Sequence, residues 1–376
     1  MSARLLHVFS TFAPGGPQVR TCRLLPELPR EWKHAIVALD GCTDARTLLD
    51  PALDVELLPS PPRASTPATA LRLARLFRER RPNLLCTYNF GALDALLAAR
   101  LAGLRAVVHH EDGFRPDEVG AQKLRRVWAR RFALGVTRAL IVPSFTLERI
   151  AREVWHQPAE RVRRIPNGIR VSDFPRADRN PARRAELGIP ADAPLVGFVG
   201  HLRPEKNPVR AVEALAACGR ADAHLLILGD GPERPRVEEA ARRLGLTSRV
   251  HLAGHRADPR PDYRAMDAFL ISSDTEQMPV ALLEAMASAL PVVSTDVGDV
   301  RAVLPEQQAA LVKSSQVASL AEALAILLSD GQRARALGEA NRARVKTSFS
   351  FREMAAQFEL VYSRALLTSE QPFRQQ

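Results

Sequence analysis

Two glutamates, Glu276 and Glu284, have the side-chain type and spacing suited to holding a polar ligand. Glu276 lies in a polar loop after the apolar run Ala268–Ile271, and Glu284 lies within the good helix formers Ala281–Ala287. Pro279 favours the start of that helix, because the N–H of a first helical residue has no intrahelical acceptor and proline loses no hydrogen bond there. Free N–H groups at a helix start favour phosphate, and carboxylates accept hydrogen bonds from hydroxyl groups. The pattern therefore predicts a site for a nucleoside diphosphate sugar.

Two cations lie earlier in the chain, just after the apolar run Leu195–Val199. Arg203 and Lys206 belong to the loop Gly200–Asn207, and a helix is expected to begin near Pro208. Cations at the carboxyl end of a buried strand can neutralise a diphosphate. The alternative is a solvated loop with ordinary surface charges, and the glutamate pair downstream favours the ligand site.

Short apolar runs alternate with helical patterns in two sets, which predicts an α/β fold with two parallel sheets covered by helices. The expected strands of the first set are Leu5–Phe9, His34–Leu39, Val55–Leu58, Leu84–Thr87, Ala106–His109 and Ala139–Pro143. Those of the second set are Leu195–Val199, His224–Leu228, Val250–Leu252, Ala268–Ile271, Val292–Ser294 and Ala309–Val312. The expected helices are Ala68–Arg81, Ala92–Leu101, Ala121–Leu134, Pro208–Cys218, Arg234–Leu244, Val280–Ala289, Val317–Leu328 and an amphipathic tail, Phe351–Leu367. A turn signal at 165–169 and a charged, proline-containing stretch predict a linker within 170–190.

The stretch 268–304 resembles the donor-binding signature of the retaining glycosyltransferases of family 4. Their pattern is Glu, seven residues and Glu, followed by a helix reading LEAMA and a strand reading PVV. Here Leu282–Ala287 reads LLEAMA and Pro291–Gly298 reads PVVSTDVG. Gln277-Met278-Pro279 departs from the Gly-Phe-Gly or Gly-Phe-Pro that is usual in the family. The loop at 200–207 is similar to the family's Gly-Arg-Leu-x-Pro-Glu-Lys-Asn, with His201 where Arg is common.

The resemblance covers nearly the whole chain and implies the GT-B fold, with two Rossmann-like domains facing a central cleft. It implies an acceptor-side domain at 1–175, a donor domain at 176–350, and a C-terminal helix at 351–376 that returns to the first domain. The implied activity is retaining, metal-independent transfer of a hexosyl or N-acetylhexosaminyl unit from a UDP-, GDP- or ADP-sugar, without a cofactor. The implied acceptor is a hydroxyl of a glycan or lipid-linked molecule, in bacterial envelope or exopolysaccharide assembly.

The family's residue roles transfer to matching positions of this chain. Glu284 would bind the ribose, Glu276 would act catalytically on the donor sugar, and Arg203 with Lys206 would bind the diphosphate. The other implied donor-binding residues are Gly16, His255, Gln277, Met278, Pro279 and Val280.

A polar cluster, His109-His110-Glu111, follows an expected strand. In the family a histidine at a comparable strand end contacts the donor sugar, and spacing does not decide between His109 and His110. Glu111 would contact the acceptor or hold the histidine. A solvated loop is the alternative for all three residues.

The net charge of +11 lies in the first half of the chain. Residues 1–175 hold 27 Lys and Arg against 17 Asp and Glu, and the remainder holds 26 against 25. In the expected helix 121–134, one stripe holds Leu124, Val127, Trp128 and Phe132, while Lys123, Arg126 and Arg130 fall opposite and Arg131 interrupts the apolar side. Such a basic amphipathic helix can lie on an anionic membrane, and a helix packed on its domain with a charged outer face is the alternative.

Composition is typical of a soluble globular chain, with no secretory or membrane-spanning segment. Four scattered cysteines without metal or redox spacing favour the cytoplasm, and no nucleic-acid partner is expected. The alternatives kept open are a sugar-nucleotide epimerase that does not hydrolyse its substrate and a non-catalytic nucleotide-sugar-binding protein. The scarcity of lysine argues against a pyridoxal-dependent phosphorylase, and the absence of a GxGxxG motif after a strand argues against a Rossmann oxidoreductase.

Overall fold

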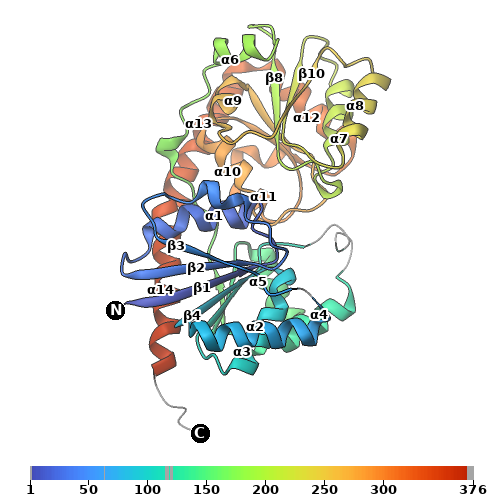
Figure 1. The fold of residues 1–376 in the computed structure, drawn as a ribbon. Helices are drawn as coiled ribbons and strands as arrows, with labels where there is room; N and C mark the ends of the chain where they lie inside the picture. The colour runs from blue at the N-terminus through green and yellow to red at the C-terminus, as the bar shows by residue number, and fades with distance from the viewer. Residues whose placement is uncertain (1, 63, 115–117, 119–121, 371–376) are drawn as a thin grey trace. The chain divides into compact units, whose positions relative to one another are not determined.

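The computed structural model describes residues 2–62, 64–114, 118 and 122–370, with side chains described up to residue 367. Within these ranges the chain divides into two compact units, one comprising Met1–Pro166 with Arg352–Gln376 and the other comprising Asn167–Phe351. Each unit contains one parallel sheet (Figure 1). The division falls after Pro166 rather than at 175, and the stretch 170–190 that was expected to be a linker belongs to the second unit.

The sheet of the first unit has the strand order β3-β2-β1-β4-β5-β6-β7. Its strands are β1 Ala3–Phe9, β2 Trp32–Ala38, β3 Val55–Leu58, β4 Leu84–Tyr88, β5 Val107–His110, β6 Ala139–Val142 and β7 Val162–Arg164. Its helices are α1 Gly16–Leu24, α2 Thr66–Arg80, α3 Leu93–Ala102, α4 Leu124–Ala133, α5 Phe145–Glu153 and, from Arg352 onward, α14 Phe351–Glu370. The start of the expected helix at residue 121 lies outside the described residues. The sequence analysis did not identify β7, α1 or α5.

The sheet of the second unit has the strand order β10-β9-β8-β11-β12-β13. Its strands are β8 Leu195–Val199, β9 His224–Leu228, β10 Val250–Gly254, β11 Ala268–Ile271, β12 Val292–Thr295 and β13 Val312–Lys313. Its helices are α6 Pro181–Glu186, α7 Pro208–Ala217, α8 Arg234–Arg243, α9 Arg260–Ala265, α10 Val280–Ala287, α11 Val300–Val303, α12 Val317–Ser329 and α13 Gly331–Ser348. In both parallel sheets the first strand of the unit lies inside the sheet, and the following strands are added first on one side of it and then on the other, as in the Rossmann fold. The predicted α/β class with two Rossmann-like units is therefore confirmed.

One predicted strand of the second unit is wrong in its position. Residues Glu306–Leu311 form a 3-10 helix, and only Val312 and Lys313 pair with β12. The apolar run at 309–312 is too short for its period to distinguish a strand from a helical turn.

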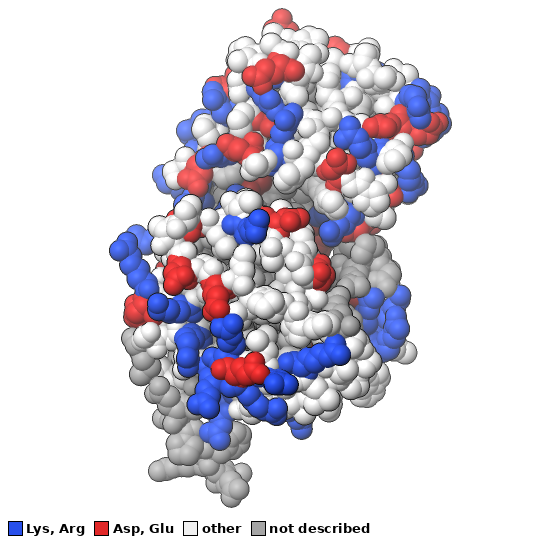
Figure 2. All heavy atoms as spheres, viewed as in Figure 1, with Lys and Arg blue, Asp and Glu red and all other residues white. Residues whose placement is uncertain are grey.

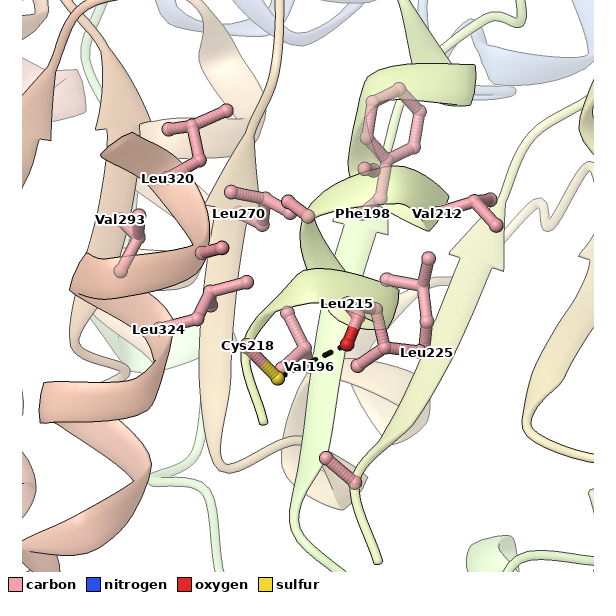
Figure 3. Close-up of a cluster of buried hydrophobic side chains, with 14 of the residues drawn as sticks. Val196, Phe198, Val212, Leu215, Cys218, Leu225, Leu270, Val293, Leu320 and Leu324 are labelled. Atoms are coloured by element: carbon pink, nitrogen blue, oxygen red, sulfur yellow. Dashed lines mark hydrogen bonds between the residues drawn. The ribbon is translucent and has the colours of Figure 1, made fainter. Parts of the chain in front are cut away.

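The core of the second unit explains why its short strands are almost wholly apolar. Val196, Leu270 and Val293, from β8, β11 and β12, are fully or almost fully buried. Figure 3 shows them lying against side chains of α7, such as Leu215, and of α12, such as Leu324. Because helices cover the sheet, a polar residue in the middle of these strands would lose its water without gaining a partner.

Arg184 explains why the expected linker is packed rather than free. This α6 residue is 1% exposed. Its guanidinium donates to the carbonyl oxygens of Ala191, Ala193 and Ala265 and pairs with Asp267 at 2.8 Å. A buried arginine with all these partners holds the stretch against β8 and α9.

The first unit contains a buried group of histidines. His7 Nε2 lies 3.2 Å from His34 Nδ1, and His7 Nδ1 lies 2.9 Å from the Tyr88 hydroxyl. His110 Nε2 and the hydroxyl of Tyr362, on α14, are 2.9 Å apart. Burial, followed by the charge of neighbouring groups, holds the pKa of His7 and of His110 well below the ordinary value, and burial lowers the pKa of His34 to about 4.

This group predicts a loss of stability in mild acid. The unfolded chain binds protons at these histidines near the ordinary pKa of 6.5, whereas folded His34 binds one only near 4. Unfolding therefore takes up protons between these values, and the free energy of unfolding should fall as the pH drops from 6.5 to 4. Urea titrations across that range should show a smaller fall for His34→Gln than for the unchanged chain. His156→Asn, at an exposed histidine of positive φ, is the control; an equal fall in all three proteins would contradict the prediction.

Candidate functional site

The strand order of the second sheet reverses between β8 and β11. In open parallel sheets, ligands bind outside the carboxyl ends of the strands at this reversal. The loop after β8 carries Arg203 and Lys206, and the loop after β11 carries Glu276. The topology therefore places the expected cations and the first expected acid at one edge of one sheet.

Lys206 and Glu276 are in direct contact. Lys206 Nζ lies 2.5 Å from Glu276 Oε1, and their side chains are 27% and 10% exposed. The Ser273 hydroxyl donates to the same carboxylate oxygen at 2.8 Å. Glu276 therefore has one oxygen fully engaged and its charge balanced by a lysine that solvent can still reach. An incoming anion can bind this lysine, and hydroxyl groups can donate to the carboxylate.

Further hydrogen bonds join the two loops. The Ser272 hydroxyl donates to the carbonyl oxygen of Asn207 at 2.9 Å. The backbone N–H of Asp274 donates to the carbonyl oxygen of Glu205 at 2.8 Å. Arg210, in the first turn of α7, donates to the Ser272 carbonyl and pairs with Asp274 at 2.6 Å. These bonds fix the loop of Lys206 against the loop of Glu276, so the contact between the two charges is positioned by the backbone.

Glu284 lies in the second turn of α10 and is 8% exposed. Its Oε2 accepts a hydrogen bond of 3.0 Å from the Tyr263 hydroxyl, on α9. Pro279 has extended backbone angles and is the N-cap residue, so α10 begins at Val280, where the expected helix Val280–Ala289 begins. No side chain caps this helix start. The Leu282 N–H donates to the Pro279 carbonyl at 3.2 Å, whereas the amides of Val280 and Ala281 precede the first intrahelical acceptor. The donor-binding roles expected of Pro279 and Val280 remain predictions.

The loop of Gln277 and Met278 is held on two sides. Asn167 Nδ2 donates to the Met278 carbonyl at 2.8 Å, and the Asp299 N–H donates to the Gln277 carbonyl at 3.0 Å. Gln277 and Met278 are both buried. Their backbone thus contributes to the shape of the loop, while their roles toward a donor remain predictions.

Gly298 permits the close approach of its backbone to Glu276. Its φ is +53°, and a Cβ there would lie 2.2 Å from the carbonyl oxygen of Glu276. Gly298→Ala should therefore displace Glu276 and lower the kcat/KM of the chain at least about tenfold. Gly245→Ala is the matched control, because Gly245 also has a positive φ, of +68°, but no atom within 4 Å of its Cβ position. Equal activity in the two variants, measured with thermal unfolding as a check on folding, would count against this role for Gly298.

Arg203 and His255 are exposed at the same edge of the sheet. Among the described residues, the Arg203 guanidinium forms no hydrogen bond or ion pair. Burial first, and then the charge of Arg203 and of His255, lower the pKa of His201, which places these three side chains within electrostatic reach of one another. The loop is supported by Gly229, where a Cβ would lie 1.9 Å from the Gly200 carbonyl oxygen.

In the first unit the two neighbouring histidines differ in environment, because successive residues of a strand point to opposite faces. His110 has both ring nitrogens bonded, Nδ1 to the Thr87 carbonyl at 3.0 Å and Nε2 to Tyr362. His109 Nδ1 lies 2.7 Å from the Thr87 hydroxyl, whereas its Nε2 has no hydrogen-bond partner in the described part of the chain. His109 Nε2 lies 3.6 Å from Glu111 Oε2, and contact of either histidine with a donor sugar remains a prediction.

Glu111 is fully buried, so the solvated-loop alternative is wrong for it as well as for His109 and His110. Its Oε2 lies 3.2 Å from Arg130 Nε and 3.6 Å from His109 Nε2. Burial would raise the pKa of Glu111, but the charge of Arg130, assisted by His109, lowers it. Within the described residues Glu111 Oε1 has no hydrogen-bond partner.

Gly16 is exposed at the first residue of α1, after β1. Gly15 caps the helix in an extended conformation, without a side-chain cap. A Cβ on Gly16 would have no atom within 4 Å. The fold therefore does not require glycine at 16, and its expected role at the donor remains a prediction.

Two contributors to the site were not predicted from the sequence. Tyr263 hydrogen-bonds Glu284, and Ser273 hydrogen-bonds Glu276. Tyr263 lies on α9, a six-residue helix with no clear periodic signal. Ser273 lies three residues before Glu276, and that spacing was a signal that could have been used.

The described residues contain neither a membrane-spanning helix nor a metal-binding cluster. No helix described here is both long enough and apolar enough to span a bilayer. Nor does this part of the chain contain a group of three or more His, Cys, Asp or Glu side chains arranged to hold a metal ion.

Comparison with known proteins identifies families and relatives. Residues 180–344 match the family described as Glycosyl transferases group 1, and residues 15–168 match the Glycosyl transferase 4-like domain. The chain is 34% identical to a D-inositol 3-phosphate glycosyltransferase of Nocardia farcinica over 202 residues, covering 50% of this chain and 44% of that protein. Thus it spans about half the length of this curated relative.

A second relative matches over more of its length. It is a GDP-mannose-dependent monoacylated alpha-(1-6)-phosphatidylinositol monomannoside mannosyltransferase of Corynebacterium glutamicum, 29% identical, with 81% of this chain and 83% of the relative covered. Among solved structures, Anabaena Alr3699/HepE in complex with UDP and glucose has a TM-score of 0.81 at 20% identity, covering 96% of this chain and all of that one. At that identity the structural likeness supports the fold alone.

Proposed function

The chain belongs to the glycosyl transferases of group 1, and from that premise we propose that it is a retaining glycosyltransferase. It moves a hexosyl or N-acetylhexosaminyl unit from a nucleoside diphosphate sugar to a hydroxyl of a glycan or lipid-linked acceptor. The observation that carries the proposal is the contact of Lys206 with Glu276 at the reversal of the second sheet. It pairs a diphosphate-binding cation with a sugar-binding acid at the edge where such sheets bind ligands.

The chemistry follows from the charges at this edge. Lys206 and Arg203 balance the negative charge that develops on the diphosphate as it leaves. The first-turn amides of α10 add to this stabilisation. Glu276 accepts hydrogen bonds from the hydroxyls of the transferred sugar, and Glu284 accepts those of the ribose. The acceptor oxygen bonds to the anomeric carbon, the bond from that carbon to the phosphate oxygen breaks, and the departing phosphate takes the acceptor's proton.

Retention and independence of metal ions are both parts of the proposal. Retention rests on the family, and metal independence rests on the cations that the loop at 203–206 already supplies. Chelation with EDTA should therefore leave turnover unchanged.

His109 is the candidate from the first unit for contact with the donor sugar. It lies at the carboxyl end of β5, and its Nε2 is not hydrogen-bonded within the described residues. Glu111 and Thr87 orient its ring from either side. Glu111 Oε1 is correspondingly the proposed contact for the acceptor hydroxyl.

We place the reaction in the cytoplasm, in assembly of an envelope glycan or exopolysaccharide. All four cysteines of the chain are free thiols, as expected of a protein from a reducing compartment. Relatives named for lipopolysaccharide core biosynthesis and for transfer to a diphosphoundecaprenol-linked sugar support this setting.

A panel of donors tests the proposal. The full chain is incubated with UDP-glucose, UDP-galactose, UDP-N-acetylglucosamine, GDP-mannose and ADP-glucose, with and without a lipid-linked sugar acceptor, and nucleoside diphosphate release is followed. Release that depends on the acceptor supports transfer. Conversion of the sugar without an acceptor would establish the epimerase instead, and no turnover of any donor, despite binding, would establish a non-catalytic binding protein.

A further inference from the structure

Helix α4 buries two of its arginines and exposes three of its large apolar residues. Arg126 and Arg130 are buried, whereas Leu124, Trp128 and Phe132 are 76%, 64% and 64% exposed. Val127 and Ala133 are buried as well, so α4 packs on its own domain. Its outer face differs from the purely polar face that is usual for such a helix, because three large apolar side chains lie there beside Arg125. The expected outward position of Arg126 and Arg130 is wrong.

The buried arginines have partners that account for this orientation. Arg126 donates to Glu118 at 2.9 Å, and Arg130 lies 3.2 Å from Glu111 and 3.4 Å from Glu118. The rings of Phe90, Phe114 and Trp155 surround the Arg130 guanidinium at 4.8 to 5.6 Å. These ion pairs hold the inner face of α4, together with the buried side chains of Val127 and Ala133, and leave Leu124, Trp128 and Phe132 on the outer face.

The outer face forms one continuous stripe. Leu124, Trp128 and Phe132 are spaced four residues apart, so their side chains follow one another along the helix. Leu101, at the end of the neighbouring α3, is a further apolar residue and is 48% exposed. Exposed apolar groups that adjoin in this way mark a surface that contacts a partner.

The surroundings of the stripe are strongly basic. Besides the buried Arg126 and Arg130, helices α2, α3 and α4 together hold seven arginines and only two acidic residues, Glu79 and Asp94. Figure 2 shows Lys and Arg side chains predominating over the part of the first unit where α2 and α3 lie in Figure 1. The Arg131 guanidinium lies 4.8 Å from the Trp128 ring, and that of Arg100 lies 5.5 Å from the Phe132 ring. Apolar side chains that lie among arginines are complementary to a surface with a negatively charged outer layer and an apolar interior.

We propose that the outer face of α4, with the adjoining end of α3, docks on an anionic lipid bilayer. Leu124, Trp128 and Phe132 enter the boundary between head groups and acyl chains, and the flanking arginines bind lipid phosphates. Tryptophan is suited to this depth because its ring is apolar and its N–H is polar. The inference does not depend on the transferase activity proposed above.

The chain carries its own probe for this contact. Of its three tryptophans, Trp32 and Trp155 are 8% and 0% exposed, and Trp128 alone faces solvent. The full chain is titrated with vesicles of phosphatidylcholine alone and of phosphatidylcholine mixed with phosphatidylglycerol. Co-sedimentation and a blue shift of tryptophan emission are expected with the mixed vesicles, and both should weaken as salt is added.

Variants locate the contact on α4. The double variant Leu124→Ser with Phe132→Ser keeps the probe and should bind mixed vesicles about tenfold more weakly or worse. Leu360→Ser with Leu367→Ser removes two similarly exposed leucines of α14 and is the matched control, expected to bind as the unchanged chain does. Arg100→Glu with Arg125→Glu should weaken binding about fivefold per arginine replaced.

Three outcomes would overturn the proposal. They are no binding to mixed vesicles, equal binding to neutral and mixed vesicles, and equal loss in both double serine variants. Self-association in sedimentation experiments without lipid, abolished by the α4 serine variant, would instead identify the stripe as an interface between two copies of the chain. Vesicle binding and donor turnover are separate measurements, so failure of one leaves the other interpretable.

Discussion

Replacing Lys206 with methionine is expected to lower kcat/KM for the nucleotide sugar by about 100-fold to 1,000-fold, the range seen when one preorganised stabilising group is removed. Methionine keeps most of the length of the chain and removes only its charge. The effect is large because Lys206 touches Glu276 at 2.5 Å and is itself reachable by solvent. Without it, the departing diphosphate loses a cation and Glu276 loses its balancing charge.

Lys313→Met is the matched control for this change. Lys313 also belongs to the second unit, pairs with Glu322 at 3.4 Å and has a side chain 25% exposed, against 27% for Lys206. Its kcat/KM should stay within about twofold of the unchanged chain, since an exposed ion pair contributes little. Turnover in Lys206→Met close to that of Lys313→Met, with both proteins folded by circular dichroism, would remove Lys206 from the mechanism.

Glu284→Ala is expected to weaken donor binding about 10-fold to 150-fold, which corresponds to about 1.5–3 kcal/mol for hydrogen bonds to a charged group. The proposed cause is the loss of the acceptor for the ribose hydroxyls. Glu284 is proposed to bind the ribose, whereas the reacting bond joins the sugar to the diphosphate. KM should therefore rise more than kcat falls. Steady-state kinetics with varied donor concentration measures both quantities.

Tyr263→Phe separates this role from a structural one. The variant removes the 3.0 Å hydrogen bond to Glu284 Oε2 but keeps the carboxylate. Its donor KM should change only a few-fold, about what a single neutral hydrogen bond contributes. If Tyr263→Phe weakens donor binding as much as Glu284→Ala does, the carboxylate serves the packing of α10 and α9 rather than the ribose.

The regular parts of the fold could be predicted from local pattern. Val55–Leu58, Leu195–Val199, His224–Leu228 and Ala268–Ile271 are strands with the predicted bounds. Their period alone does not distinguish a strand from a helical turn, but their regular alternation with longer helical stretches favours strands. The family motifs at 200–207 and 268–304 explain why Arg203, Lys206 and Glu276 could be named together, whereas the reversal of strand order next to β8 came from the structure.

Other features depend on contacts that local pattern does not contain. The stretch 170–190 was expected to be a linker because it is charged and contains proline, but the bonds of Arg184 bury it. For helix α4 the sequence left open whether its apolar stripe faces a membrane or the domain. The buried partners of Arg126 and Arg130 hold those arginines inside and leave Leu124, Trp128 and Phe132 exposed. The difference between His109 and His110 required knowledge of Tyr362, which lies 252 residues away in sequence from His110.

The central claim is that the loops after β8 and β11 hold the diphosphate of a nucleotide sugar. Calorimetric titration of the full chain with UDP, GDP and ADP, alongside Lys206→Met and Lys313→Met, tests it most directly. We predict that one of the nucleotides binds the unchanged chain and Lys313→Met with equal affinity and binds Lys206→Met about tenfold or more weakly. Equal affinity in all three proteins, or no binding of any nucleotide to the unchanged chain, would contradict the claim.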